Sequence, residues 1–198
     1  MPTLLQDTAI PAISLGEWSS SRGGSTCNLS VDNQPFLVQL NKQKDPLFSP
    51  FGLNIYGDEK TNQEAKRLNL DLDISDRPDL IEKLHAIDEQ VLSHLAESNK
   101  FKNLHDNYRH MVVTDEKYGS KRLRLKVNVQ GISSCSVWNA VTQTKIEPRE
   151  IDYRNAGICA IISFSKIYSM SKQIGVICEA KTLLITPKSE ECPITMMQ

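Results

Sequence analysis

The run RLNLDLDIS alternates between apolar and polar residues from Leu68 to Ile74. A period of two puts every second side chain on the same face of a β-strand, so the run predicts a strand with one buried face. The following stretch, DRPDLIEKLHAIDEQVLSHLAESNKF, repeats its apolar residues every three or four positions, which is typical of an amphipathic helix. Asp76 suits the N-cap and Pro78 the first turn, and we predict one principal helix over residues 77–99.

Period two returns after the helix, and shorter apolar runs precede it. We predict strands in PFLVQLNK, KDPLFSPFGLNIYGDE, KRLRLKVNVQ and SVWNAV. Three strands, one helix and further strands in this order favour a mainly β fold with one principal helix. The specific prediction is an OB-fold-like Greek-key antiparallel barrel, with the helix between the third and fourth strands.

The segment GICAIISFSKIYSMSKQIGVICEAKTLLI, Gly157 to Ile185, is the least polar long stretch. A membrane-spanning helix needs about 20 nearly uncharged residues, and Lys166, Lys172 and Glu179 interrupt the segment too often for that. Its many β-branched and aromatic residues favour a long hairpin that turns around Met170–Lys172. We therefore expect no membrane association.

Composition divides the chain into three regions. Residues 1–33 contain SSSRGGSTCN and little periodicity, which predicts an extended N-terminal arm. We expect an OB-fold-like nucleic-acid-binding domain over residues 34–187 and a flexible C-terminal tail over residues 188–198. The N-terminus has no basic start followed by an apolar stretch, so no signal peptide is expected. The five cysteines form no CxxC pair, which indicates free thiols in an intracellular, reducing compartment, the cytoplasm or nucleus of a host.

No catalytic or metal-binding pattern stands out. The four histidines have no HExxH spacing, and no nucleophile elbow, P-loop or dinucleotide-binding glycine motif occurs. Asp71 and Asp73 share one strand face and could bind a metal, but exposed carboxylates opposite a buried leucine face are the simpler interpretation. We expect neither an enzyme nor a cofactor.

Basic residues cluster at the start of the strand after the helix. Arg122, Arg124 and Lys126 share one strand face, next to Lys121, and Lys117 precedes them. Cations spaced about 7 Å apart could follow the phosphates of a single nucleic-acid strand. The net charge of −1 requires any such affinity to be local. A solvated strand face explains the cluster equally well.

Aromatic residues follow the basic strand. Trp138, Phe164 and Tyr168 are candidates for stacking on bases, each stack being worth roughly 1–3 kcal/mol. Phe164, Lys166 and Tyr168 share parity, and a lysine would not readily point into a core, so the three are expected to face outward. A bulge near Ser165 would reverse this parity.

Three segments together resemble single-stranded-DNA-binding proteins of large eukaryotic DNA viruses and bacteriophages. They are PFGLNIYGDEKTNQEAKRLNLDLDIS, PDLIEKLHAIDEQVLSHLAES and the block from Gly157 to Ile185. The resemblance covers about residues 46–186 and implies an OB-fold that binds single-stranded DNA in replication and recombination, often as a homodimer. Phage members end in a strongly acidic tail that recruits replication proteins. Here TPKSEECPITMMQ has only Glu190 and Glu191, which puts that recruitment in doubt.

The predicted function is therefore binding of single-stranded DNA, or single-stranded RNA, without sequence preference. The alternative is a β-rich structural or protein-interaction module that binds no nucleic acid. The predicted site consists of Lys117, Lys121, Arg122, Arg124, Lys126, Trp138, Phe164, Lys166 and Tyr168.

Overall fold

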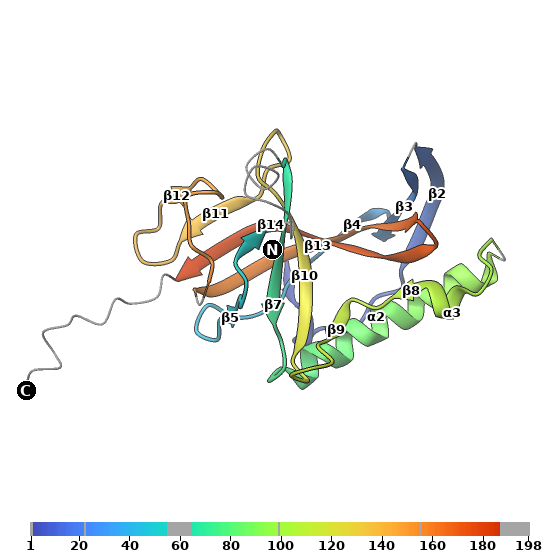
Figure 1. The fold of residues 1–198 in the computed structure, drawn as a ribbon, viewed down its shortest axis with the longest axis horizontal. Helices are drawn as coiled ribbons and strands as arrows, with labels where there is room; N and C mark the ends of the chain where they lie inside the picture. Colours follow the sequence, from blue (N-terminus) through green and yellow to red (C-terminus); the bar gives the residue numbers. More distant parts are fainter. Residues whose placement is uncertain (1, 22, 55–64, 99, 155, 187–198) are drawn as a thin grey trace, which may run out of the picture.

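The computed structural model describes residues 2–21, 23–54, 65–98, 100–154 and 156–186 (Figure 1). The chain is mainly β with one principal helix, as predicted. Among these residues no helix is long and apolar enough to cross a membrane. The elements are β1 (Thr3–Leu4), η1 (Leu5–Asp7), β2 (Ser14–Ser21), β3 (Gly24–Val31), β4 (Gln34–Gln39), β5 (Leu47–Phe48), β6 (Leu53–Asn54), β7 (Arg67–Asp73), α2 (Pro78–Glu97), α3 (Leu104–Asn107), β8 (Tyr108–Arg109), β9 (Val112–Thr114), β10 (Lys121–Asn128), β11 (Ser136–Asn139), β12 (Lys145–Ile146), β13 (Gly157–Met170) and β14 (Gln173–Thr186).

Strand pairing closes into a circuit. β13 pairs with β5, β5 with β7, β7 with β10, β10 with β14, and β14 again with β13. The β10–β14 pairing is parallel and the others are antiparallel. Alternate residues of these strands, among them Leu70, Leu125 and Ile158, are fully buried in one core. The alternation in the sequence thus corresponds to the inner faces of paired strands.

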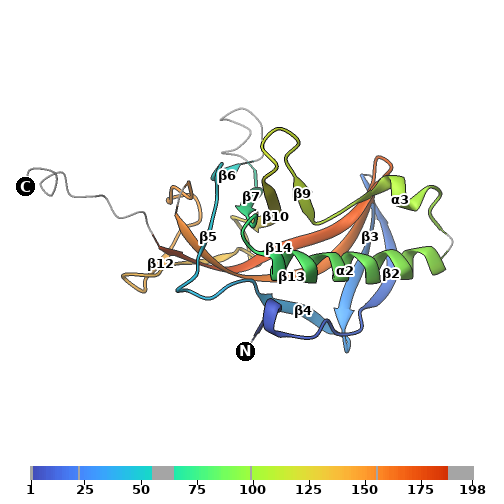
Figure 2. The ribbon, with the colours of Figure 1, turned by 90° about the horizontal axis from the view of Figure 1, so that it is seen from below.

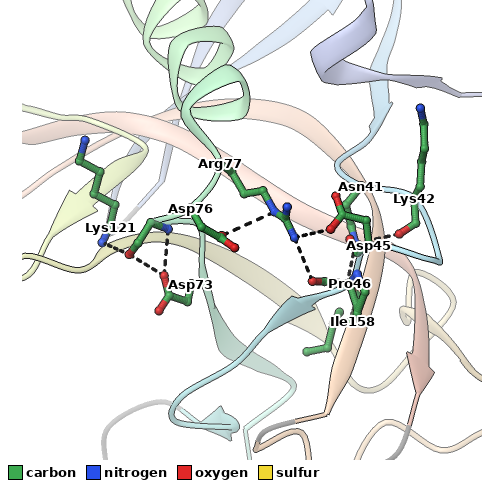
Figure 3. A network of polar contacts seen from close by, with 10 residues as sticks. Asn41, Lys42, Asp45, Pro46, Asp73, Asp76, Arg77, Lys121 and Ile158 are labelled. Atoms are coloured by element: carbon green, nitrogen blue, oxygen red, sulfur yellow. Dashed lines mark hydrogen bonds and ion pairs between the residues drawn. The ribbon is translucent and has the colours of Figure 1, made fainter.

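The helix α2 lies beside the long hairpin of β13 and β14 and buries its apolar stripe (Figure 2). It begins at Pro78, and Arg77 occupies the N-cap position without a side-chain cap, so the expected cap by Asp76 is wrong. The Arg77 guanidinium instead donates to Asp45 Oδ1 over 2.6 Å and lies 3.6 Å from Asp76 Oδ1 (Figure 3). This network fixes the helix start to the segment before β5.

The N-terminal region is part of the folded body, so the extended arm predicted for residues 1–33 is wrong. β3 pairs with β13 from Lys166 to Ser169, and β2 pairs with β3. Leu5, Ile13 and Leu29 are buried in the core. β2 and β3 are rich in serine and threonine because only one face of their hairpin is apolar. This polar composition gave the sequence too little periodicity to predict the two strands.

The hairpin of β13 and β14 confirms the interpretation of the Gly157–Ile185 segment. Its turn at Ser171 and Lys172 has both residues at positive φ, 51° and 66°. The pairing shifts between Phe164 and Lys166, which leaves Ser165 as an extra residue in β13. The predicted C-terminal tail, 188–198, lies outside the described residues.

Candidate nucleic-acid interface

A groove of about 660 Å³ lies between the β2–β3 hairpin, the β7–β10 pair and the tip of the β13–β14 hairpin. The segment from Arg109 to Met111 and Val113 close its remaining side. Among the described residues that line it, none is an aspartate or glutamate. The basic and aromatic side chains in its wall are Arg67, Arg109, His110, Arg124, Lys126 and Tyr168.

Tyr168 is positioned by a glycine on the neighbouring strand. It pairs with Gly175, and a Cβ atom added there would lie 3.1 Å from Tyr168 Cε1 and Oη. The half-buried ring therefore lies across the backbone of β14. Burial raises the pKa of the Tyr168 hydroxyl, while the charges of Arg109 and Arg124 act to lower it. An aromatic ring and two guanidinium groups thus share this part of the groove.

Arg124 is held against the groove floor by a buried carboxylate. Its Nε and one terminal nitrogen donate to the two oxygens of Asp71, over 2.7 and 2.9 Å. Asp71 is only 2% exposed, because β7 and β10 place it directly opposite Arg124. The bidentate pair fixes the guanidinium plane. The expectation that Asp71 is a solvent-exposed carboxylate is therefore wrong.

The other two groove cations on the β7–β10 pair have neutral partners. Lys126 Nζ donates to Asn69 Oδ1 over 2.6 Å, and Arg67 Nε donates to Asn128 Oδ1 over 2.8 Å. Partial burial, and next the charges of Arg124 and Arg67, lower the pKa of the Lys126 ammonium. Like charges crowd here because the strand register brings them together. A bound anion would reduce the repulsion between these cations and so stabilise this part of the groove.

The remaining basic residues of the predicted cluster lie outside the groove wall. Arg122 shares the face of Arg124 but donates to Asp115 Oδ2 over 2.7 Å and stacks 4.9 Å from the centre of the Phe51 ring. Lys117 lies over the exposed ring of Tyr118, in the turn before β10. Lys121 is exposed at the start of β10.

Phe164 cannot stack on bases. It is 0% exposed and packs against Phe36, with ring centres 5.2 Å apart. The bulge at Ser165 puts it on the opposite side of β13 from Lys166, which is exposed. The predicted outward orientation of Phe164 is wrong, because one extra residue reverses the alternation.

Trp138 is 39% exposed but belongs to a different part of the sheet. Its partner on β14 is Leu184, whereas the residues of β14 that line the groove extend only to Cys178. Six residues of strand separate these two positions, a path of about 20 Å along β14. The structure therefore does not bring Trp138 to the groove with Tyr168.

Both arginines of the groove other than Arg124, namely Arg67 and Arg109, were absent from the predicted set. Arg67 shares parity with Asn69 and Asp71, so the alternating run carried a signal for its outward face. Arg109 stands in the aperiodic connection after the helix. Only its backbone pairing beside Gly175 brings it to the groove.

Comparisons with known proteins support the fold. No protein-family model matches the chain, and no curated protein sequence does. Among solved structures, the chain is similar to gp2.5, a single-stranded DNA binding protein encoded by bacteriophage T7. The identity is 10% over 83% of this chain and 96% of that chain, with a TM-score of 0.51. The single-stranded DNA-binding protein from bacteriophage Enc34 in complex with ssDNA gives 12% identity over 89% and 97%, with a TM-score of 0.48. The similarity to gp2.5 shows that the two chains share a fold.

Proposed function

We propose that this protein binds single-stranded DNA without sequence preference. The observation that carries the proposal is the groove, in which Arg67, Arg109, Arg124 and Lys126 surround the half-buried ring of Tyr168. Cations attract the phosphate backbone, and an aromatic face accepts any base. A wall without carboxylates among the described residues suits a polyanion.

The fold is consistent with this proposal. The closed strand circuit, with a parallel pairing of β10 and β14, fits a five-stranded OB-type barrel, and such barrels commonly bind oligonucleotides. The similar protein of bacteriophage T7 is named as a single-stranded DNA binding protein. The described cysteines are free thiols, which is consistent with a protein that acts in a reducing compartment.

Binding can be tested by fluorescence anisotropy with labelled oligo-dT, oligo-U and duplex DNA over a salt series. We expect oligo-dT to bind more tightly than the duplex, with affinity falling as salt rises. Absence of binding to any of them at low salt would rule out the proposal in favour of a structural or interaction module. Preferential binding of oligo-U would make RNA the ligand.

The groove itself is tested by removing two of its charges. Arg67→Ala/Arg109→Ala should reduce the slope of log affinity against log salt by about 1.4, because each phosphate contact on a single strand contributes about 0.7. The matched control is Lys44→Ala/Lys83→Ala, since neither lysine lines the groove. An equal change in both variants would indicate general charge attraction.

A further inference from the structure

A buried carboxylate of α2 lies next to the groove and faces two imidazoles. Asp88 is 0% exposed and accepts hydrogen bonds from the Tyr108 hydroxyl over 2.7 Å and from the Met111 backbone N–H over 3.0 Å. Its Oδ2 also lies 3.3 Å from His110 Nδ1. Burial raises the pKa of the Asp88 carboxyl. A carboxylate in this position gains stability from a nearby cation.

The second imidazole comes from the helix itself. His85 lies one turn before Asp88, so both side chains project from the same side of α2. One potential ligand atom from each of His85, Asp88 and His110 lies within 4.8 Å of the other two. Both histidines are exposed, which leaves a path from solvent to the buried carboxylate.

We propose that His85, Asp88 and His110 form a binding site for a late first-row divalent cation, of which Zn²⁺ is the representative. Imidazole nitrogen and carboxylate oxygen are ligands that zinc accepts, whereas Mg²⁺ and Ca²⁺ prefer oxygen alone. Tetrahedral zinc with bonds near 2.1 Å places its ligand atoms about 3.4 Å apart. His110 Nδ1 already lies 3.3 Å from Asp88 Oδ2, and the proposed site requires the exposed His85 imidazole to rotate toward them. Solvent would supply the fourth ligand.

The surroundings of Asp88 match what a ligating carboxylate requires. Ligating carboxylates are themselves held by hydrogen bonds that fix their orientation. The Tyr108 hydroxyl donates such a hydrogen bond to Asp88 Oδ1, and the Met111 N–H donates one to Oδ2. Each oxygen can accept more than one interaction, so Oδ2 can accept the Met111 N–H and still bind a cation beside His110 Nδ1.

The test uses the full chain after dialysis against a chelator, titrated with Zn²⁺ alone by calorimetry. We expect one equivalent to bind, and Mg²⁺ to give no saturable heat. His85→Ala and His110→Ala should each weaken binding by at least about 100-fold, since losing even a residue that only orients a metal ligand costs about 10- to 100-fold. The control His105→Ala, another exposed histidine, should bind as the native chain does.

Three results would overturn the proposal. The first is no saturable Zn²⁺ binding, which leaves Asp88 as a structural hydrogen-bond acceptor. The second is binding that persists in His85→Ala/His110→Ala, with circular dichroism confirming that this variant is folded. The third is a thiolate charge-transfer band when Co²⁺ is used as a probe, because it would place the metal on cysteines. No nucleic acid is needed, so the outcome is independent of the proposed function.

Discussion

Tyr168 offers its ring to the groove while covering Gly175, and these two roles can be separated. Tyr168→Phe keeps the ring, so oligo-dT affinity should stay within about twofold. Tyr168→Leu still covers the glycine but removes the stacking surface. We expect it to lose about 1–3 kcal/mol per stacked base, or 5- to 150-fold in affinity, measured by anisotropy. Trp138→Ala is the control and should bind normally; equal losses at both positions would contradict the assignment.

Phe164 is expected to matter for stability. Its side chain is fully buried against Phe36, and replacing a buried phenylalanine by alanine typically costs about 3–5 kcal/mol. Urea denaturation of Phe164→Ala should show that loss in the free energy of unfolding. A Phe164→Leu variant, which leaves a smaller cavity, should lose less. A cost under about 1 kcal/mol would contradict the burial of the ring.

At the scale of single elements, alternation in the sequence predicted the inner faces of β7 and β10, because a period of two reports burial directly. It could not predict the register between the strands. That register places Asp71 opposite Arg124, so this groove cation is also held in an ion pair that the sequence did not predict. Periodicity also does not reveal a single extra residue in a strand. The bulge at Ser165 therefore places Phe164 in the core, where the alternation had predicted an outward side chain.

The turn of the β13–β14 hairpin contains residues poorly suited to its backbone. Ser171 and Lys172 both adopt positive φ, where asparagine and glycine are favoured. Ser171→Asn/Lys172→Gly should therefore stabilise the protein by about 1 kcal/mol, seen as a higher thermal midpoint. Ser171→Val/Lys172→Val is the opposite control and should lower it. A lower midpoint in the Asn-Gly variant would mean that the turn is not of this type.

The segment Tyr108–Met111 links the proposed metal site to the groove, because His110 and Arg109 are adjacent in sequence. A cation bound at Asp88 holds this segment against α2 and limits the positions open to Arg109. Zn²⁺ should then raise oligo-dT affinity several-fold, and oligo-dT should raise Zn²⁺ affinity by the same factor. Paired titrations measure both values. No change in either affinity would show that the two sites are not coupled.

At the scale of the whole molecule, the sequence predicted the main helix, the long hairpin and the mainly β character. It did not reveal that residues before Pro35 belong to the same core. β2 and β3 are rich in Ser, Thr and Gly, and their apolar face consists of Leu15 and Trp18 on β2 and Cys27, Leu29 and Val31 on β3. Long-range pairing with β13 makes these strands stable, and that pairing has no local signature in the sequence.

Deleting residues 2–33 distinguishes a docked arm from a structural part of the sheet. The deletion removes the buried side chains of Leu5, Ile13 and Leu29, and it uncovers the edge of β13 from Lys166 to Ser169. Burying each such side chain is worth about 1.5–3 kcal/mol, so together they rival the net stability of a typical domain. We expect the shortened chain to be insoluble or to lack cooperative thermal unfolding by circular dichroism. Leu29→Ala in the full chain should lower the free energy of unfolding by about 2–5 kcal/mol, and this variant should still unfold cooperatively. A shortened chain that unfolds at the native midpoint would restore the arm interpretation.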